Sequence, residues 1–344
     1  MKIKHYDYLI VGLGVAGALM TYRLRAAGKS VVVFNDDRRP CASLVAAGII
    51  NPVTGKKFVK SWQIDLLLKE AITCYSWIEK QENISLLHKM NIVRVLPDIG
   101  AENSWLSRKQ DPAYAPFVME NASLESAGEK LHTPSILAEI SQSYRVDLSC
   151  LIGYLKDILQ YEYAYHSEVL QYENLKRQDG LWQYGHFTTN GVIFCEGYKG
   201  IHNPFFGDPG FTPSGGEAVF VKIPGLGLEK MYKDELFIVP LGNDNYWVGG
   251  GYNIDADHTG EAGIQRLKAH ISKITDMKFD ILSYHAAWRP ATKYRRPFLM
   301  QHPSLDSMYL LNGLGTKGAS LAPWLTSLLY AHLTDNIPLP GSFV

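Results

Sequence analysis

Closely spaced glycines near the N-terminus are the first residues whose pattern suggests chemistry. The sequence GLGVAG at 12–17 is a G-x-G-x-x-G pattern between an apolar run at 8–11 and an amphipathic stretch that ends at Gly28. In that context the glycines permit a tight turn, close approach of the backbone to a pyrophosphate, and close packing of helix on strand. The helix N-terminus then faces the anion. The pattern therefore predicts a dinucleotide site, formed by Gly12, Gly14, Val15, Ala16 and Gly17.

The residues after the next strand leave the identity of the dinucleotide open. VVVF at 31–34 is typical of a buried parallel strand, and it leads to Asn35, where FAD and NAD proteins usually carry an acid that binds the adenosine ribose. An Asn carbonyl can accept the same hydrogen bond without a charge. Arg38 or Arg39 would suit the 2′-phosphate of NADP, but Asp36 and its neighbour Asp37 would repel it.

Apolar patterns elsewhere indicate an α/β chain with a second domain. Strand-like segments at 217–223, 236–242 and 246–252 lie close together, which is typical of an antiparallel sheet. Near the C-terminus a strand, the glycine turn GLGTKG at 313–318 and a helix recur. A second glycine turn is more than NAD normally needs, and it suits the longer FAD molecule. Residues 97–130 are rich in turn formers, and we expect them to be irregular.

We therefore predict an α/β fold, α+β overall, in which a parallel, helix-covered, Rossmann-like FAD-binding domain carries an inserted, mainly antiparallel substrate domain. The expected FAD-binding domain comprises 1–60, 140–212 and 287–344. The expected substrate domain comprises 61–139 and 213–286.

Composition narrows the function classes. The 344 residues include 34 basic and 34 acidic side chains, so the zero net charge offers no general attraction for nucleic acid or an anionic membrane. The four cysteines are scattered, which favours reduced thiols, and no apolar run reaches the roughly 18 residues of a membrane span. We expect a cytoplasmic protein without a metal, because Asp255, Asp257 and His258 lack a further ligand cluster.

Seven matches in the same order, one of them a set of three strands, resemble the family of FAD-dependent oxidoreductases that includes D-amino acid oxidase and glycine oxidase. The resemblance covers essentially the full chain; its segments are GLGVAG, CASLVAAGIINP, RVDLSCLIGYL, GVIFCEG, the strands PSGGEAVFV, FIVPLG and WVGGGY, WRPAT, and LGTKGASLAP. The last segment is most similar to the oxidase half of bifunctional tRNA wobble-uridine enzymes. Glu196 in GVIFCEG replaces the small residue that the family has there.

The resemblance implies FAD as the cofactor, with Asn35 as an uncharged acceptor for the ribose or Asp36 in its place. It implies non-covalent binding, because no cysteine follows Cys195 for the C-terminal attachment of sarcosine oxidases. The further cofactor-binding residues that it implies are Ser43, Ala46, Ala47, Gly48, Gly197, Gly313, Leu314, Gly315, Thr316, Lys317 and Gly318.

The resemblance also implies a reaction, the oxidation of an amine C–N bond by hydride transfer to flavin N5. Arg289 in WRPAT matches the residue that binds the substrate carboxylate, and a guanidinium suits a carboxylate through paired hydrogen bonds. Lys317 is expected to stabilise negative charge at the flavin N1–C2=O edge. Phe237 stands where the amino-acid oxidases often have a substrate-contacting Tyr, and Tyr252 is expected to line the same pocket.

The expected substrate is a small-molecule amine, an amino acid or N-substituted amino acid, and the electron acceptor is O2 or an unknown compound. An amine attached to tRNA stays open. Two alternatives also stay open. The unusual Asn35, Glu196 and Phe237 are compatible with an FAD-binding accessory protein without turnover. Arg38 and Arg39 are compatible with an NADP-dependent dehydrogenase.

Overall fold

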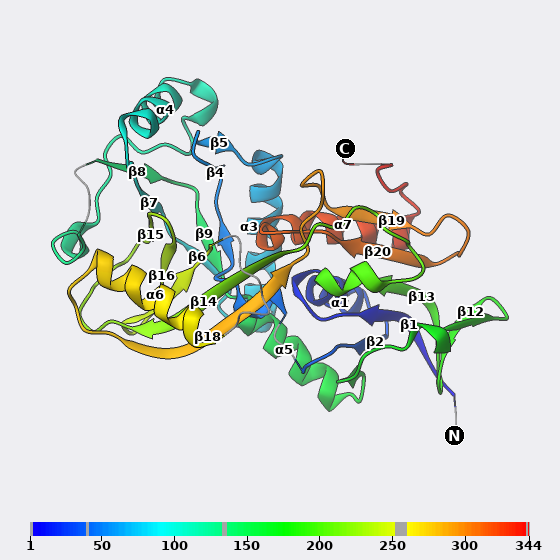
Figure 1. Ribbon diagram of the computed structural model, residues 1–344. Coiled ribbons are helices and arrows are strands. Elements are labelled where there is room, and N and C mark those ends of the chain that lie inside the picture. Colours follow the sequence, from blue (N-terminus) through cyan, green and yellow to red (C-terminus); the bar gives the residue numbers. More distant parts are fainter. Residues whose placement is uncertain (1–2, 39–40, 133–135, 252–259, 342, 344) are drawn as a thin grey trace.

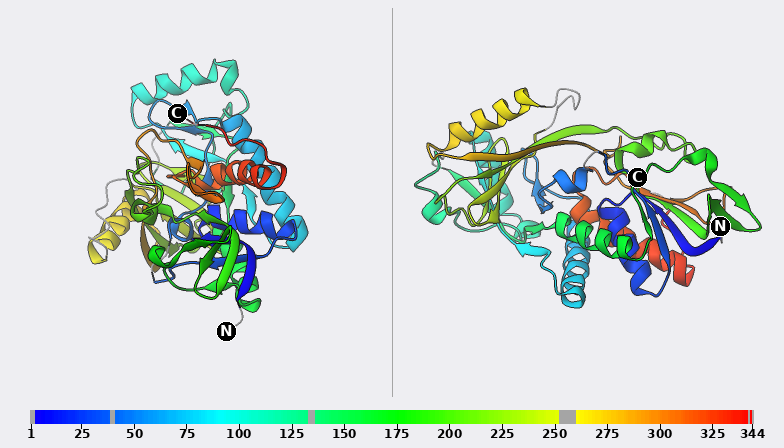
Figure 2. Two further views of the ribbon diagram at one scale, coloured as in Figure 1. Left: turned by 90° about the vertical axis from the view of Figure 1, so that its right-hand side faces the viewer. Right: turned by 90° about the horizontal axis from the view of Figure 1, so that it is seen from below.

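The computed structural model describes residues 3–38, 41–132, 136–251, 260–341 and 343. Two lobes lie side by side, each built around a large β-sheet, and the long strands β14 (Ser214–Lys222) and β18 (Asp280–Arg289) run from one lobe to the other (Figures 1 and 2). The division of the chain into FAD-binding and substrate domains at the boundaries given above remains our proposal.

The sheet of the first lobe is mixed. Its parallel strands are β10 (Tyr165–His166), β2 (Val31–Phe34), β1 (Lys4–Val11), β13 (Phe187–Phe194) and β20 (Met308–Asn312). Its antiparallel strands are β12 (Leu181–Tyr184), β11 (Lys176–Gln178) and β19 (Phe298–Gln301). The expectation of a parallel domain was therefore incomplete. The hairpin partner β12 pairs with the first half of β13 and β20 with the second half, so one long strand supports both.

Helices α1 (Val15–Ala26), α3 (Ile64–Glu82), α5 (Leu148–Tyr161) and α7 (Gly318–Asp335) belong to the first lobe. α1 packs against α5 and α7, and α3 packs against α7, where the buried Tyr75 hydroxyl donates to the Ala319 carbonyl at 2.9 Å. The shorter elements are α2 (Ala42–Val45), a three-stranded sheet of β3 (Ile49–Ile50), β9 (Tyr144–Val146) and β6 (Leu87–Lys89), and a two-stranded sheet of β4 (Val53–Thr54) and β5 (Val59–Lys60). No described helix is both long and apolar enough to cross a membrane.

The sheet of the second lobe has the order β18-β14-β17-β16-β15-β7-β8 and is antiparallel except where β15 meets β7. Its other strands are β17 (Asn245–Gly249), β16 (Phe237–Gly242), β15 (Met231–Lys233), β7 (Ile92–Val95) and β8 (Leu137–Ile140). One face buries Val219, Ile238 and Val248 beneath α6 (Glu261–Ile274). The opposite face joins the core of the first lobe through residues such as Val239 and Trp247.

One expectation for the second lobe was wrong. Residues 97–130 contain the helix α4 (Ile99–Lys109), which turn-rich composition concealed. The Asp98 side chain caps its start by accepting the Ala101 N–H at 2.8 Å, and its single buried side chain, Trp105, lies 5.2 Å from the ring of Phe58. A cap and one long-range aromatic contact therefore position a helix that has little apolar periodicity.

Candidate active site

The first glycine turn has the geometry that its sequence predicts. Gly12 has a φ of 96°, and a Cβ there would lie 2.5 Å from the Cys195 carbonyl oxygen. A Cβ on Gly17 would lie 1.9 Å from the Gly12 carbonyl oxygen, so only glycine lets α1 pack this closely on β1. At the start of α1 the Val15 N–H is held by the Ser43 hydroxyl at 3.0 Å.

A cavity of about 1160 Å³ extends from this turn into the second lobe. Gly17 and Gly313 do not line it, because they serve the packing and the turn geometry behind the surface. The other residues predicted for the cofactor do: Gly12, Gly14, Val15, Ala16, Asn35, Asp36, Ser43, Ala46, Ala47, Gly48, Gly197, Leu314, Gly315, Thr316, Lys317 and Gly318. One elongated space therefore joins both glycine turns.

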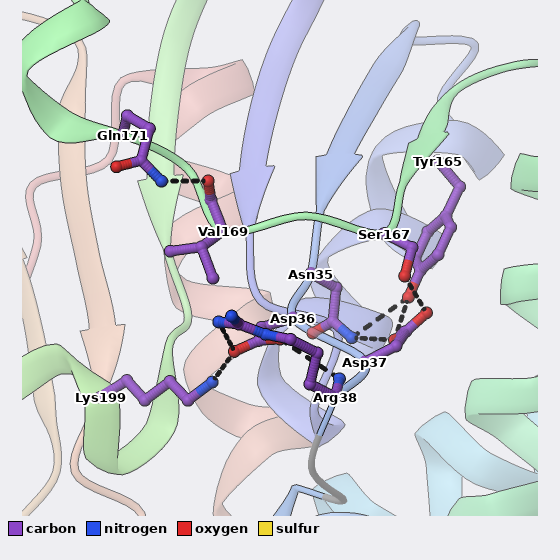
Figure 3. Close-up of polar contacts among 9 residues, drawn as sticks. All are labelled: Asn35, Asp36, Asp37, Arg38, Tyr165, Ser167, Val169, Gln171 and Lys199. Carbon is purple, nitrogen blue, oxygen red and sulfur yellow. Dashed lines mark hydrogen bonds and ion pairs between the residues drawn. The ribbon is translucent and has the colours of Figure 1, made fainter.

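Asn35 fastens the first turn. Its Oδ1 accepts the Leu13 N–H at 2.8 Å, and its Nδ2 donates to the Asp37 carboxylate at 2.7 Å and the Tyr165 hydroxyl at 3.1 Å (Figure 3). Part of the hydrogen-bonding capacity of the amide oxygen is thus used within the protein. That Asn35 accepts a ribose hydroxyl stays a prediction.

Asp36 supplies a carboxylate at the same end of the cavity, clasped between two cations (Figure 3). Arg38 donates to it through Nε at 2.7 Å and Nη2 at 2.9 Å, and Lys199 contacts it from the segment after β13. The hydrogen bond from Arg38 lowers the pKa of Asp36 well below its usual range, with Lys199 adding to the effect. Arg38 is therefore committed to a carboxylate. Arg39 lies outside the described residues.

The Asp37 carboxylate points away from Asp36 and accepts hydrogen bonds from a separate set of donors (Figure 3). Its carboxylate accepts from Lys156 at 2.8 Å, from the Tyr165 hydroxyl at 2.6 Å and from the Ser167 hydroxyl at 2.8 Å. Burial raises the pKa of Asp37, but these donors outweigh it and lower the pKa to about 2. Asp37 thus ties β2 to α5 and to the strand β10 beside it.

The segment from Ser43 to Gly48 is fixed by contacts with distant elements. Gly48 has a φ of 70°, and a Cβ there would lie 2.0 Å from the Val146 carbonyl oxygen. Trp247 of the second lobe donates its Nε1–H to the Val45 carbonyl at 2.8 Å in a buried contact. The small residues therefore bring bare backbone to the cavity wall, as the sequence predicts.

The second glycine turn lies beside the first. A Cβ on Gly318, the first residue of α7, would lie 3.0 Å from Cγ1 of Val15, the first residue of α1. The N-termini of these two helices therefore border the same part of the cavity, where their unpaired N–H groups favour anions. Asn312 fixes the turn by donating to the Gly197 carbonyl at 2.9 Å and accepting the Gly313 N–H at 2.8 Å.

Lys317 caps α7 and lines the cavity without a carboxylate within 4 Å among the described residues. Burial lowers the pKa of its ammonium group, and the nearby Arg296 and Arg295 lower it further. A negative charge placed here would therefore be attracted by a cluster of positive groups.

Arg289 lines the cavity at the end of β18. Its guanidinium donates to the Gly215 carbonyl through Nη1 at 2.9 Å and to the Gly251 carbonyl through Nη2 at 3.1 Å. The side chain crosses directly over Gly216, where a Cβ would lie 2.1 Å from Nη2. The glycine pair at 215–216 thus makes room for the guanidinium.

The aromatic residues predicted for the substrate pocket have different outcomes. Phe237 lines the cavity from β16. Tyr252 lies outside the described residues.

Glu196 is a half-buried acid whose contacts the sequence did not indicate. It lines the cavity at the end of β13 and accepts from the Tyr172 hydroxyl at 2.5 Å and from Asn203 at 2.8 Å. Burial raises the pKa of its carboxyl group, and the two donors offset part of that increase. Tyr172 begins a short 3-10 helix and Asn203 follows another, and no sequence motif marks either residue.

Comparison with known proteins identifies the family. The family model DAO, described as FAD dependent oxidoreductase, matches residues 7–331. The chain belongs to this family. Family membership confirms the predicted resemblance and establishes an FAD-dependent oxidoreductase, so neither an NADP-dependent dehydrogenase nor a cofactor-binding accessory protein is retained. The cradle of bare backbone between two helix N-termini fits the pyrophosphate and flavin of FAD.

Individual relatives are distant. The chain is 23% identical to the glycine oxidase of Bacillus subtilis (strain 168) over 97% of this chain and 94% of that protein. It is 22% identical to a bifunctional protein of tRNA 5-methylaminomethyl-2-thiouridine biosynthesis from Dichelobacter nodosus (strain VCS1703A), with 96% of this chain aligned but only 55% of that protein.

Solved structures share the fold across the whole chain. Glycine oxidase from Geobacillus kaustophilus superposes with a TM-score of 0.77 at 18% identity, covering 99% of this chain and 100% of that one. Iminodiacetate oxidase from Chelativorans sp. BNC1 gives a TM-score of 0.76 at 17% identity, covering 98% and 97%. At these identities the likeness concerns the fold.

Proposed function

We propose that this flavoprotein oxidises the C–N bond of an amino acid or an N-substituted amino acid. The observation that carries the proposal is Arg289, whose guanidinium shares one cavity with the turn at 313–318. The guanidinium lines the cavity and donates to the carbonyl groups of Gly215 and Gly251. Guanidinium groups bind carboxylates through charge-assisted hydrogen bonds, so a substrate carboxylate would be stabilised at this point. The names of the relatives, glycine oxidase and iminodiacetate oxidase, agree with this substrate class.

Bound FAD would supply the redox chemistry by accepting hydride at N5 from the carbon that bears the nitrogen. The chain's own contribution is to orient the substrate and to stabilise charge. Arg289 anchors the carboxylate, and Phe237 offers an apolar wall without the hydroxyl of a Tyr. Lys317 and the N-terminus of α7 favour negative charge at the N1–C2=O edge of the flavin. FAD is held without a covalent bond.

We favour a free small molecule over an amine attached to tRNA, with O2 or another compound as the electron acceptor. The chain has 34 basic and 34 acidic side chains, so it has no excess positive charge to attract a polynucleotide.

The test is visible absorption of the purified, FAD-loaded protein under anaerobic conditions, with glycine, sarcosine, proline and D-amino acids added in turn. We expect the flavin bands to bleach with at least one of these compounds. Flavin bands that stay intact with the whole panel, while dithionite still reduces them, would contradict the proposal.

A further inference from the structure

Two cations lie beyond Phe237 on the same face of the sheet, next to the residues that line the cavity. Lys233 on β15 is in register with Phe237 on the neighbouring β16, and on its other side with Arg94 on β7. Residues in register on neighbouring strands point to the same face of a sheet. Because Phe237 lines the cavity, Lys233 and Arg94 face the same side, at the edge nearest the β4–β5 hairpin.

Neither cation has a carboxylate within 4 Å among the described residues. Lys233 donates to the Glu235 carbonyl at 2.5 Å, and its ammonium lies 5.0 Å from the centre of the Phe237 ring. Arg94 donates to the Gly55 carbonyl at 2.8 Å. Both residues are half-buried, so each keeps part of its surface in contact with solvent. Their charges are thus solvated less than on an open surface and are not neutralised.

The acids nearest to Lys233 in the sequence are engaged on their own partners. Asp234 lies 3.1 Å from His270 of α6, and Glu235 lies 3.3 Å from Lys273 of the same helix. The structure therefore directs these carboxylates toward the α6 face of the sheet. Lys233 is left on the cavity face.

The lowered pKa values of Lys233 and Arg94 agree with a site that lacks its anion. Burial is the main cause that lowers the pKa of Lys233 to about 8, and the positive charge of Arg94 contributes. Burial likewise lowers the pKa of Arg94. Two like charges held side by side out of bulk water cost stability, and a bound anion would offset that cost.

We propose that Lys233 and Arg94 bind a second carboxylate of the substrate. The inference rests on the proposed function, in which Arg289 binds the first. Arg289 reaches the Gly251 carbonyl just beyond β17, and β15 lies two strands further along the sheet. Neighbouring strands lie about 4.8 Å apart, so the backbones of β17 and β15 are separated by roughly 10 Å. The lysine side chain can extend toward Arg289, so the two bound carboxylates would be closer together than this. The substrate class is then a dicarboxylic amino or imino acid, longer than glycine or sarcosine.

The experiment is a titration of the FAD-loaded enzyme with straight-chain dicarboxylates from succinate to suberate, followed by the change in the flavin spectrum. Each dicarboxylate is compared with the monocarboxylate of equal carbon number. We expect the best dicarboxylate to bind roughly 10- to 100-fold more tightly than its partner, as one added charge-assisted hydrogen bond or ion pair allows. Equal affinities throughout the series would overturn the proposal.

Variants separate this subsite from a structural role. Lys233→Gln and Arg94→Gln should each reduce the preference for the dicarboxylate about tenfold and leave monocarboxylate binding unchanged. Lys273→Gln is the matched control, because it removes the same charge from the opposite face of the sheet, and it should retain the preference. A preference that persists in both Lys233→Gln and Arg94→Gln would also overturn the proposal.

The outcome also distinguishes this inference from the proposed function. Flavin reduction by amino acids, combined with no dicarboxylate preference, would reject the second subsite alone. A dicarboxylate preference that disappears in the two variants, combined with flavin that no mono- or dicarboxylic amine reduces, would support the anion subsite and reject amine oxidation.

Discussion

The two ends of the cavity differ in whether their charged side chains form ion pairs within the protein. At the end near β2, Asp36 is paired with Arg38 and Lys199, and Asp37 is paired with Lys156 nearby. On the substrate side, Lys317 and Lys233 have no carboxylate within 4 Å among the described residues, and each has a pKa lowered mainly by burial.

This difference indicates what each end does. Charges that are paired within the protein hold backbone segments together and leave little net charge for a ligand. Positive charges left unpaired by the protein cost stability and attract anions. We therefore propose that the β2 end binds the uncharged adenosine, and that the flavin and the carboxylates of a substrate complete the electrostatics of the other end.

The largest expected effect comes from removing the carboxylate anchor. Arg289→Met should lower the second-order rate constant for anaerobic flavin reduction at least 100-fold, since truncating one partner of a buried charge pair costs about 2–5 kcal/mol. Stopped-flow absorption measures this rate. The FAD content should stay at the wild-type level, and a rate within threefold of wild type would show that the charge at the substrate end is not used for binding.

A smaller effect of the same origin should follow from crowding the guanidinium. Gly216→Ala would place a methyl group 2.1 Å from the present position of Nη2, so the side chain must move. We expect flavin reduction to slow roughly 10- to 100-fold, as for a misplaced positioning group, with unchanged dissociation of FAD. Gly242→Ala is a control for the loss of a glycine in the same sheet, because a Cβ there meets nothing within 4 Å although its φ of 93° adds strain.

At the β2 end, removing one charge should weaken the cofactor site only moderately. Asp36→Asn releases Arg38 and Lys199, and we expect roughly five- to tenfold weaker FAD binding, measured by fluorescence titration of the apoprotein. Lys156→Gln, which breaks an ion pair outside the cavity wall, should leave FAD affinity unchanged. Equal losses in both variants would show that the pairs act only through stability.

The smallest effect concerns stability and pH. The pKa of Asp37 falls from an ordinary 3.8 to about 2, so its stabilising contribution is fully present above pH 4 and is lost as the pH falls toward 2. The free energy of unfolding of Asp37→Asn should therefore be lower than that of wild type at pH 6. Denaturant unfolding should show this difference shrinking below pH 4. A difference that grows on acidification would have the wrong sign for this network.

The sequence predicted the parts of the site that depend on local backbone. Gly12 and Gly17 occur at a spacing that allows few other structures, and each has a backbone atom within 2.5 Å of where a Cβ would stand. The turn at 313–318 and the small residues at 46–48 were predicted in the same way, from glycines and small residues that allow close approach of the backbone. These features need only a strand, a glycine and a helix that are adjacent in the chain.

The paired and unpaired charges could not be predicted in this way. Asp36 meets Lys199, and Lys233 meets Arg94, only because strands that are distant in the sequence become neighbours in the sheets. Asn35 illustrates the same limit: its residue type suggested a ribose acceptor, but only the fold shows that its carbonyl also accepts the Leu13 N–H. Long-range pairing decides which polar groups are left for a ligand.

The most direct test of the account compares each amino acid with the amine that lacks its carboxylate, using anaerobic flavin reduction by sarcosine and dimethylamine, glycine and methylamine, or proline and pyrrolidine. We predict that the wild-type enzyme prefers the amino acid of a productive pair at least 100-fold, and that Arg289→Met abolishes most of this preference. Equal reduction rates for the two members of a productive pair in the wild-type enzyme would contradict it.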